Sequence, residues 1–139
     1  MCLDISRTYH RAYAKPKVAT FPILTYKGLD KGWNDNTASY SRLVSPYRGT
    51  EYKFGQLYTS NLRRWELEVE QGLHSCITRE QASFHGELAF PSVIPVGSQY
   101  YLGQRNDVVS TQLIVFSSIK AVEKHFGVAI APAVKRNTL

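Results

Sequence analysis

The sequence has no hydrophobic run near the roughly 18 residues that a membrane-spanning helix needs. Its opening segment, MCLDISRTYH, lacks the long apolar core of a secretory signal, so we expect a cytoplasmic protein. Cysteine is scarce, since Cys2 and Cys76 make no disulfide framework and are expected to be ordinary thiols. No internal repeat, low-complexity tract or long Pro/Gly/Ser linker divides the chain. Residues 1–139 are therefore predicted to form one domain.

Complete catalytic and metal-binding motifs are also missing. The four histidines form no H-E-x-x-H pair, and no G-x-S-x-G segment occurs. His74-Ser75-Cys76 places a nucleophile beside a base, but a strand end before a helix explains the same residues. One His and one Cys do not supply the four ligands of a closed zinc site. We therefore expect a protein that is not an enzyme, with no catalytic residue, metal or cofactor.

Negative charge is in short supply. The chain has 11 Asp and Glu against 17 Lys and Arg, a formal net charge of +6. Much of the excess lies at the ends, which predicts a basic N-terminal arm at about 1–18 and a short basic C-terminal tail at about 131–139. A positive field attracts polyanions, so nucleotides, nucleic acids and acidic proteins are all candidate partners. A solvated arm explains the same residues without a partner.

Apolar and β-branched residues predict most of the strands. They occur at 19–27, 47–58, 65–70, 88–94 and 108–116. Strict alternation from Trp65 to Glu70 predicts one half-buried strand with its acids toward solvent. Two stretches rich in turn-forming residues predict a long loop at 28–43 and a turn at 97–107.

Two short helices are predicted from their capping signals. Thr78-Arg79-Glu80-Gln81 has the form of a capping box and predicts a helix that runs toward Leu88. Ser117 or Ser118 can cap a second helix, IKAVEKHF, which Gly127 is placed to end. Strands and helices do not alternate regularly, so we predict an α+β fold with a mostly antiparallel or mixed sheet of about five to seven strands.

Two glycine-flanked, aromatic-rich turns are the candidate binding segments, YRGT at 47–50 and YYLGQRN at 100–106. Phosphate recognition needs a forked cation, hydroxyl and backbone donors, and glycine for close approach. Purine rings favour an aromatic face and an amide partner. An ion-pair or surface role explains the two arginines equally well. The candidate ligand-binding residues are Arg48, Gly49, Thr50, Phe84, Tyr101, Arg105 and Asn106.

Four segments resemble, in the same order, a group of small phage and prophage proteins. They are SPYRGTEYKFGQLY, EQGLHSCITREQA, VIPVGSQYYLGQ and STQLIV. The group is identified as including the Thoeris anti-defence proteins of the first type, which are sponges for cyclic ADP-ribose signals. Leu73 and Cys76 stand where the family pattern has aromatic residues, and residues 28–42 have no counterpart in it.

This resemblance implies an oligomeric binding protein without catalysis. Such a sponge holds a cyclic nucleotide immune signal intact in the infected bacterial cell, so that the host effector is not activated. The resemblance also implies ligand sites at or near subunit contacts. Some members take the cyclic oligonucleotides of other immune systems, such as CBASS.

Two other functions stay open. Tyr26-Lys27-Gly28, the 47–50 turn and segment 72–78 are similar to the nicotinamide-site strands of ADP-ribosyltransferases. Neither Glu87 nor Glu123 is a convincing match for the catalytic glutamate of that family. The basic arm, RTYHRAYAKPK, interleaves tyrosines with cations, which predicts an inhibitor that binds a host protein or nucleic acid.

Overall fold

The protein has an α+β fold, as predicted. The computed structural model describes residues 3–4, 15–46, 49–65, 68–103 and 106–132. Within these residues lie twelve strands and two helices, so the strands outnumber the prediction. Every strand-to-strand pairing that is described is antiparallel.

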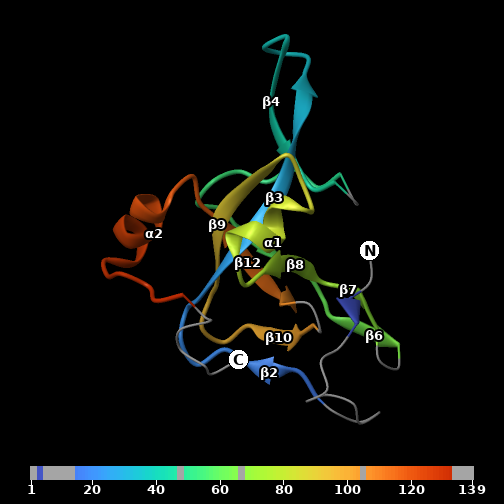
Figure 1. Cartoon of the computed structure of the whole chain (residues 1–139), viewed down its shortest axis with the longest axis vertical. Helices are drawn as coiled ribbons and strands as arrows, with labels where there is room; N and C mark the ends of the chain where they lie inside the picture. The colour runs from blue at the N-terminus through green and yellow to red at the C-terminus, as the bar shows by residue number, and fades with distance from the viewer. Residues whose placement is uncertain (1–2, 5–14, 47–48, 66–67, 104–105, 133–139) are drawn as a thin grey trace.

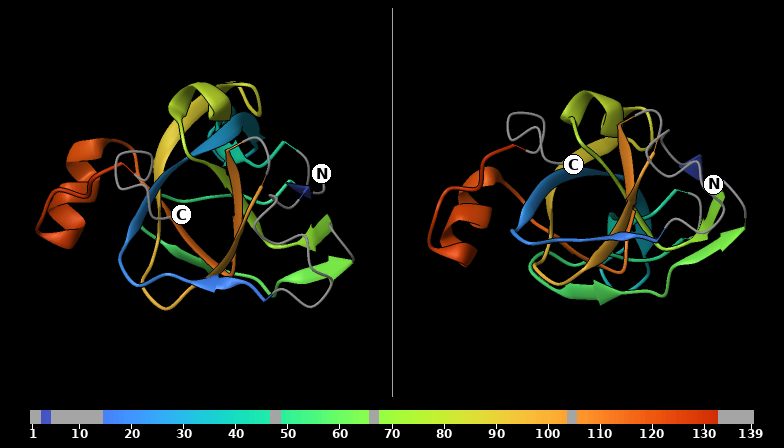
Figure 2. Two further views of the ribbon diagram at one scale, coloured as in Figure 1. Left: turned by 60° about the horizontal axis from the view of Figure 1, so that its bottom comes forward. Right: turned by 90° about the horizontal axis from the view of Figure 1, so that it is seen from below.

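The large sheet has the strand order β2-β10-β11-β8-β3-β9-β12-β5, and β4 is added to the far end of β3. Its members are β2 (Lys17–Val18), β3 (Ile23–Asn34), β4 (Ser39–Val44), β5 (Leu57–Thr59), β8 (Leu73–Cys76), β9 (Leu88–Ile94), β10 (Gln99–Leu102), β11 (Asp107–Ser110) and β12 (Gln112–Val115). A small sheet of β1 (Leu3–Asp4), β7 (Glu68–Gln71) and β6 (Arg63–Trp65) lies beside it. The large sheet curls on itself, and the β3–β4 hairpin projects beyond it (Figures 1 and 2).

Alternation along the long strands separates two apolar clusters. Ile23 and Leu29 of β3 point into the main core, where they join Val108 and Leu113 from the opposite part of the sheet. Leu24, between them, belongs instead to a cluster on the other face. The curled sheet therefore encloses one core and presents a second apolar face to a helix.

Helix α2 (Ile119–Phe126) covers that second face. Ser118 is its N-cap and accepts a hydrogen bond from the Ala121 amide, and Gly127 ends the helix at φ 73°. Val122 is fully buried against the sheet. This helix confirms the prediction made from the capping residues.

Helix α1 (Arg79–Ser83) begins where predicted but is shorter than expected. The Thr78 hydroxyl accepts from the Gln81 amide at 3.1 Å, as a capping box requires. The helix ends at Ser83 with Phe84 as its C-cap, well before Leu88, and Gly86 then packs closely against the backbone of Leu29 before β9 begins. Its one buried side chain is Ala82.

The predicted long loop at 28–43 is wrong. β3 continues to Asn34, and β4 returns beside it from Ser39, so most of this stretch is a hairpin. Trp33 and Tyr40 pack edge to face at 5.1 Å across it. Aromatic pairing across two strands thus outweighs the turn-forming residues of the sequence.

Three further boundaries differ from the prediction. The stretch expected to be one strand at 65–70 contributes to two paired strands, β6 and β7, although the buried position of Val69 agrees with the alternation. The 108–116 strand is divided into β11 and β12, and β10 occupies part of the predicted turn at 97–107. In the predicted N-terminal arm, β1 and β2 pair with β7 and β10, whereas 5–14 lie outside the described residues. The C-terminal tail lies outside them from residue 133.

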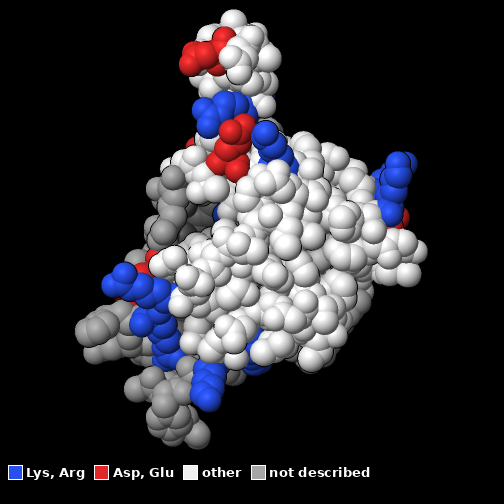
Figure 3. All heavy atoms as spheres, turned by 180° about the vertical axis from the view of Figure 1, so that it is seen from behind, with Lys and Arg blue, Asp and Glu red and all other residues white. Residues whose placement is uncertain are grey.

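Among the described residues, no helix has the length and hydrophobicity needed to cross a membrane. The rear face in Figure 3 is mostly uncharged, and Lys and Arg side chains gather along one lower flank of it.

Candidate ligand-binding cleft

The most unusual junction of the large sheet lies between β3 and β8, which we call the seam. β3 pairs with β9 along seven consecutive residue pairs, from Ile23↔Ile94 to Leu29↔Leu88. Among the described residues it pairs with β8 only at Tyr26↔Cys76. One residue further along β3, the Lys27 ammonium donates to the His74 carbonyl at 2.6 Å. A side chain thus satisfies a strand carbonyl that a neighbouring strand would otherwise bond.

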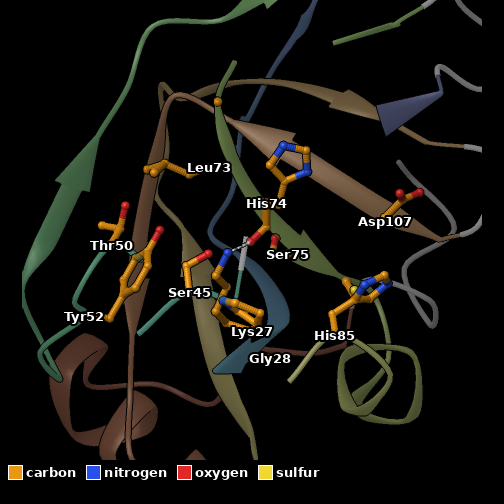
Figure 4. Close-up of a pocket in the computed structure, with 13 residues that line it drawn as sticks. Lys27, Gly28, Ser45, Thr50, Tyr52, Leu73, His74, Ser75, His85 and Asp107 are labelled. Atoms are coloured by element: carbon orange, nitrogen blue, oxygen red, sulfur yellow. Dashed lines mark hydrogen bonds between the residues drawn. The ribbon is translucent and has the colours of Figure 1, made fainter. Parts of the chain in front are cut away.

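A cleft opens at the seam. It contains a cavity of about 80 Å³, more than one water molecule needs. Lys27 comes from β3, Ser75 from β8 and Asp107 from β11, while Thr50 and Tyr52 lie on the segment after β4. Figure 4 shows the Lys27 amine turned toward the His74 carbonyl, with Tyr52 and Asp107 on different sides of it.

Lys27 is the buried cation of this cleft, and the residue as a whole is only 7% exposed. Burial lowers the pKa of its ammonium from 10.5 to about 8, and the neighbouring Cys76 opposes that shift more weakly. Its Nζ lies 5.3 Å from the centre of the Tyr52 ring, a cation–π distance. An ammonium has three donors, and among the described residues the His74 carbonyl is its one hydrogen-bond acceptor. Two donors are therefore available to a ligand.

The Cys76 thiol and the Tyr52 hydroxyl beside Lys27 remain protonated at neutral pH. Burial first, and then the Asp107 carboxylate, raise the pKa of the Cys76 thiol to about 11, although Lys27 acts in the opposite direction. Burial also raises the pKa of Tyr52 to about 12, with a smaller effect from Tyr58. Cys76 is therefore a neutral thiol rather than an activated nucleophile. Tyr52 keeps its hydroxyl proton as a donor.

Two buried oxygens in the cleft have no hydrogen-bond partner among the described residues, Ser75 Oγ and Asp107 Oδ1. A buried polar group left in this state costs about 1–3 kcal/mol. Native proteins keep few such groups, and binding sites are one place where they occur. The cleft therefore offers spare donors at Lys27 and a spare acceptor at Asp107, with a hydroxyl at Ser75 that can act either way.

Two glycines bring helix α1 close to the seam. A Cβ atom on Gly28 would lie 2.4 Å from the Ala82 carbonyl oxygen, and one on Gly86 would lie 2.5 Å from the Leu29 amide nitrogen. Only glycine permits this approach of two backbones. The close contact places His85, which follows the helix, in the lining of the cleft.

One residue of the first candidate turn, 47–50, lines this cleft. Thr50 lines it, and Gly49 lies in the adjoining turn, where its amide donates to the Ser45 carbonyl at 2.9 Å. Gly49 has φ 67°, a conformation that favours glycine. Arg48 lies outside the described residues, as does Arg105 of the second turn.

The remaining predicted residues lie elsewhere. Tyr101 is buried with Val69 and Val109 in a separate cluster, where the Arg64 guanidinium lies 5.5 Å from its ring. Asn106 is exposed at φ 60°, beside Asp107 in sequence, and its carbonyl accepts from the Ile77 amide. Phe84 is 74% exposed at the end of α1 and does not line the cleft. Of the predicted side chains that the structure describes, Thr50 lines the cleft, whereas Phe84, Tyr101 and Asn106 do not.

Lys27, Ser75 and Asp107 are absent from the predicted ligand-binding residues, although Lys27 and Ser75 lie in segments that resemble the nicotinamide site of ADP-ribosyltransferases. The available signal is the position of Lys27, a cation near the end of the apolar stretch ATFPILTYK. Side chains alternate between the two faces of a strand, so Lys27 lies on the same inward face as the buried Ile23 and Thr25. Ser75 and Asp107 carry no comparable signal, because their burial depends on the packing of strands distant in sequence.

The described part of the chain contains no group of three or more His, Cys, Asp or Glu residues that could hold a metal ion. The chain matches no family model, no curated protein and no solved structure.

Proposed function

We propose that the cleft binds an anionic nucleotide and holds it unchanged, as a sponge for an immune signal of the cyclic ADP-ribose type. The observation that carries this proposal is the Lys27 ammonium, which is buried at the seam with two donors free for a ligand. The proposal also places the protein among phage anti-defence proteins that act in the bacterial cytoplasm, in agreement with the resemblance noted in its sequence.

The groups of the cleft suit the parts of such a ligand. A phosphate oxygen accepts from the Lys27 ammonium, whose attraction is strengthened by the low dielectric of a buried site. Ribose hydroxyls satisfy Asp107 Oδ1 and Ser75 Oγ, both of which are otherwise unpaired among the described residues. Sequestration requires no chemistry, because a micromolar Kd corresponds to about −8 kcal/mol and a few such bonds can supply it.

A second candidate is an enzyme of the ADP-ribosyltransferase type. One observation favours it: the three segments that resemble nicotinamide-site strands all contribute to the same cleft, through Lys27 and Gly28, Thr50, and 72–76. This enzyme would bind NAD, another nucleotide with two phosphates and two riboses. The two functions therefore share a ligand class and differ in what happens to the ligand.

One experiment separates these functions. The purified protein is incubated with cyclic ADP-ribose isomers, cyclic oligonucleotides or NAD, and the free ligand is removed by filtration. The retained fraction is then denatured and analysed by mass spectrometry. We expect an intact cyclic nucleotide, whereas nicotinamide released from NAD would support the enzyme. If the protein retains none of these nucleotides, the result would favour an inhibitor that binds a host protein or nucleic acid.

A matched pair of lysine variants locates the site. Lys27→Met removes the buried cation and keeps a long apolar side chain, whereas Lys31→Met removes an exposed cation from the same strand. We expect Lys27→Met to lower retention at least tenfold, the effect of about 1.4 kcal/mol, and Lys31→Met to leave it unchanged. Equal retention by both variants would contradict the assignment of the ligand to this cleft.

A further inference from the structure

The environment of Lys27 suits a second kind of chemistry, that of an amine with a carbonyl compound. Its Nζ is held at the seam by the His74 carbonyl and lies over the Tyr52 ring. The residue is almost fully buried and lines the cavity of the cleft. The amine is therefore fixed in position next to a space that a small molecule can enter.

We propose that Lys27 is a covalent capture site, where the amine condenses reversibly with the aldehyde group of a small hydroxy-aldehyde that enters the cleft. This inference goes beyond the proposed function, because it concerns aldehydes and holds whether or not a nucleotide binds. The class includes short sugars in their open-chain form. The product is an imine on Lys27 Nζ.

The reaction needs no redox partner. The lone pair of the neutral amine attacks the aldehyde carbon, forming a C–N bond, while the carbonyl oxygen takes up a proton to give a carbinolamine. That hydroxyl then leaves with a proton as water, and the nitrogen lone pair forms the C=N bond. Addition of water reverses the sequence and releases the aldehyde.

The protonation state of Lys27 supports this chemistry. With a pKa of about 8, roughly 10% of the amine is neutral at pH 7, against about 0.03% for a lysine at the unperturbed value of 10.5. Desolvation of a lysine in an apolar site is a recognised means of producing a nucleophilic amine. Burial also disfavours the ammonium relative to the neutral amine, so imine formation meets a smaller opposing cost than at the surface.

One feature of the cleft selects a hydroxy-aldehyde over a simple alkyl aldehyde. Ser75 Oγ is buried without a partner among the described residues. Because Tyr26 pairs with Cys76, Ser75 lies opposite Lys27 on the same face of the sheet, whereas Asp107 pairs with Cys76 and lies on the other face. An aldehyde bound to Lys27 can therefore present its hydroxyl toward Ser75 Oγ, and a molecule without that hydroxyl leaves this oxygen unsatisfied.

The test measures the labelling rate of each lysine in the intact protein. Glycolaldehyde is added with sodium cyanoborohydride, which reduces the imine to a stable secondary amine, and peptide mass mapping quantifies every site. We expect Lys27 to be labelled at least about tenfold faster than the exposed Lys31 at pH 7, because burial leaves a larger fraction of the Lys27 amine neutral than its unperturbed pKa would. Lys27 labelled no faster than Lys31 would overturn the proposal. The assay contains no nucleotide, so its outcome is independent of nucleotide binding.

Further measurements distinguish capture in the cleft from general reactivity. The Lys27 rate should level off above about pH 8 in the folded protein, whereas in the urea-unfolded chain it should continue to rise toward pH 10. Unfolding in urea should make the two rates equal, and a difference that persists in urea would assign the effect to local sequence. Propionaldehyde, which lacks the hydroxyl, should label Lys27 more slowly than glycolaldehyde, and equal rates would overturn the selection by Ser75.

Discussion

The two neighbours of β3 define two contrasting regions of the molecule. On the β9 side, seven consecutive residue pairs join the strands, and the buried Thr25 and Ser92 hydroxyls hydrogen-bond to each other across them at 2.7 Å. On the β8 side, the one described pair is Tyr26↔Cys76, and a cleft with a buried cation takes the place of further pairing. The same strand is thus a structural element on one side and one wall of the cleft on the other.

A small sheet can form a cleft without a separate domain, where the pairing of two neighbouring strands stops. Where the ladder continues, backbone groups bond each other and side chains pack. Where it stops, backbone and side-chain groups require other partners. Lys27 provides one at the His74 carbonyl, and Ser75 and Asp107 remain unpaired among the described residues. The cleft therefore forms where the pairing between β3 and β8 is interrupted.

The largest effect is expected on the paired side. Leu29→Ala should lower the free energy of unfolding by about 2–5 kcal/mol, because Leu29 is fully buried and the main core would be left with a cavity. Urea denaturation followed by circular dichroism measures this change. Leu57→Ala is the control, since Leu57 is 47% exposed and should cost less than about 1 kcal/mol. Equal losses would show that β3 does not anchor the core.

The sequence predicts this paired region better than it predicts the seam. The bounds of β9 and of α2 follow directly from β-branched runs and capping residues, which act locally. The polar β3–β4 hairpin was missed because its stability comes from cross-strand contacts such as Trp33 with Tyr40. The cleft depends on β3, β8 and β11 meeting in space, and no local pattern encodes where a ladder ends.

A pH titration should distinguish the seam from the rest of the fold. Between pH 8 and 10.5 the unfolded chain keeps a proton on Lys27 that the folded chain has lost, since the folded pKa is about 8. Stability therefore rises with pH in that window, by up to about 3 kcal/mol relative to Lys27→Met. Urea unfolding of both proteins at several pH values measures this difference. A constant difference from pH 7 to 10.5 would contradict the burial of the cation.

The raised pKa of Cys76 acts in the opposite direction. The unfolded thiol loses its proton near its usual value of 9, and the folded thiol keeps it to about 11, so this group lowers stability as pH rises. The same effect occurs in wild type and in Lys27→Met, and it largely cancels in their difference. Wild type alone can therefore show a flat profile without contradicting the prediction.

The smallest change compares one serine from each region. Ser92→Ala on the paired side removes the closer partner of the buried Thr25 hydroxyl, which keeps only its longer bond to the backbone carbonyl of residue 92 at 3.4 Å, and should cost about 0.5–1.5 kcal/mol. Ser75→Ala removes a hydroxyl that has no partner among the described residues, so stability should stay the same or rise by up to about 1 kcal/mol. Urea denaturation of both variants gives the two signs. A loss at Ser75 as large as that at Ser92 would mean that Ser75 is bonded within the protein, and its role as a group kept for a ligand would then fail.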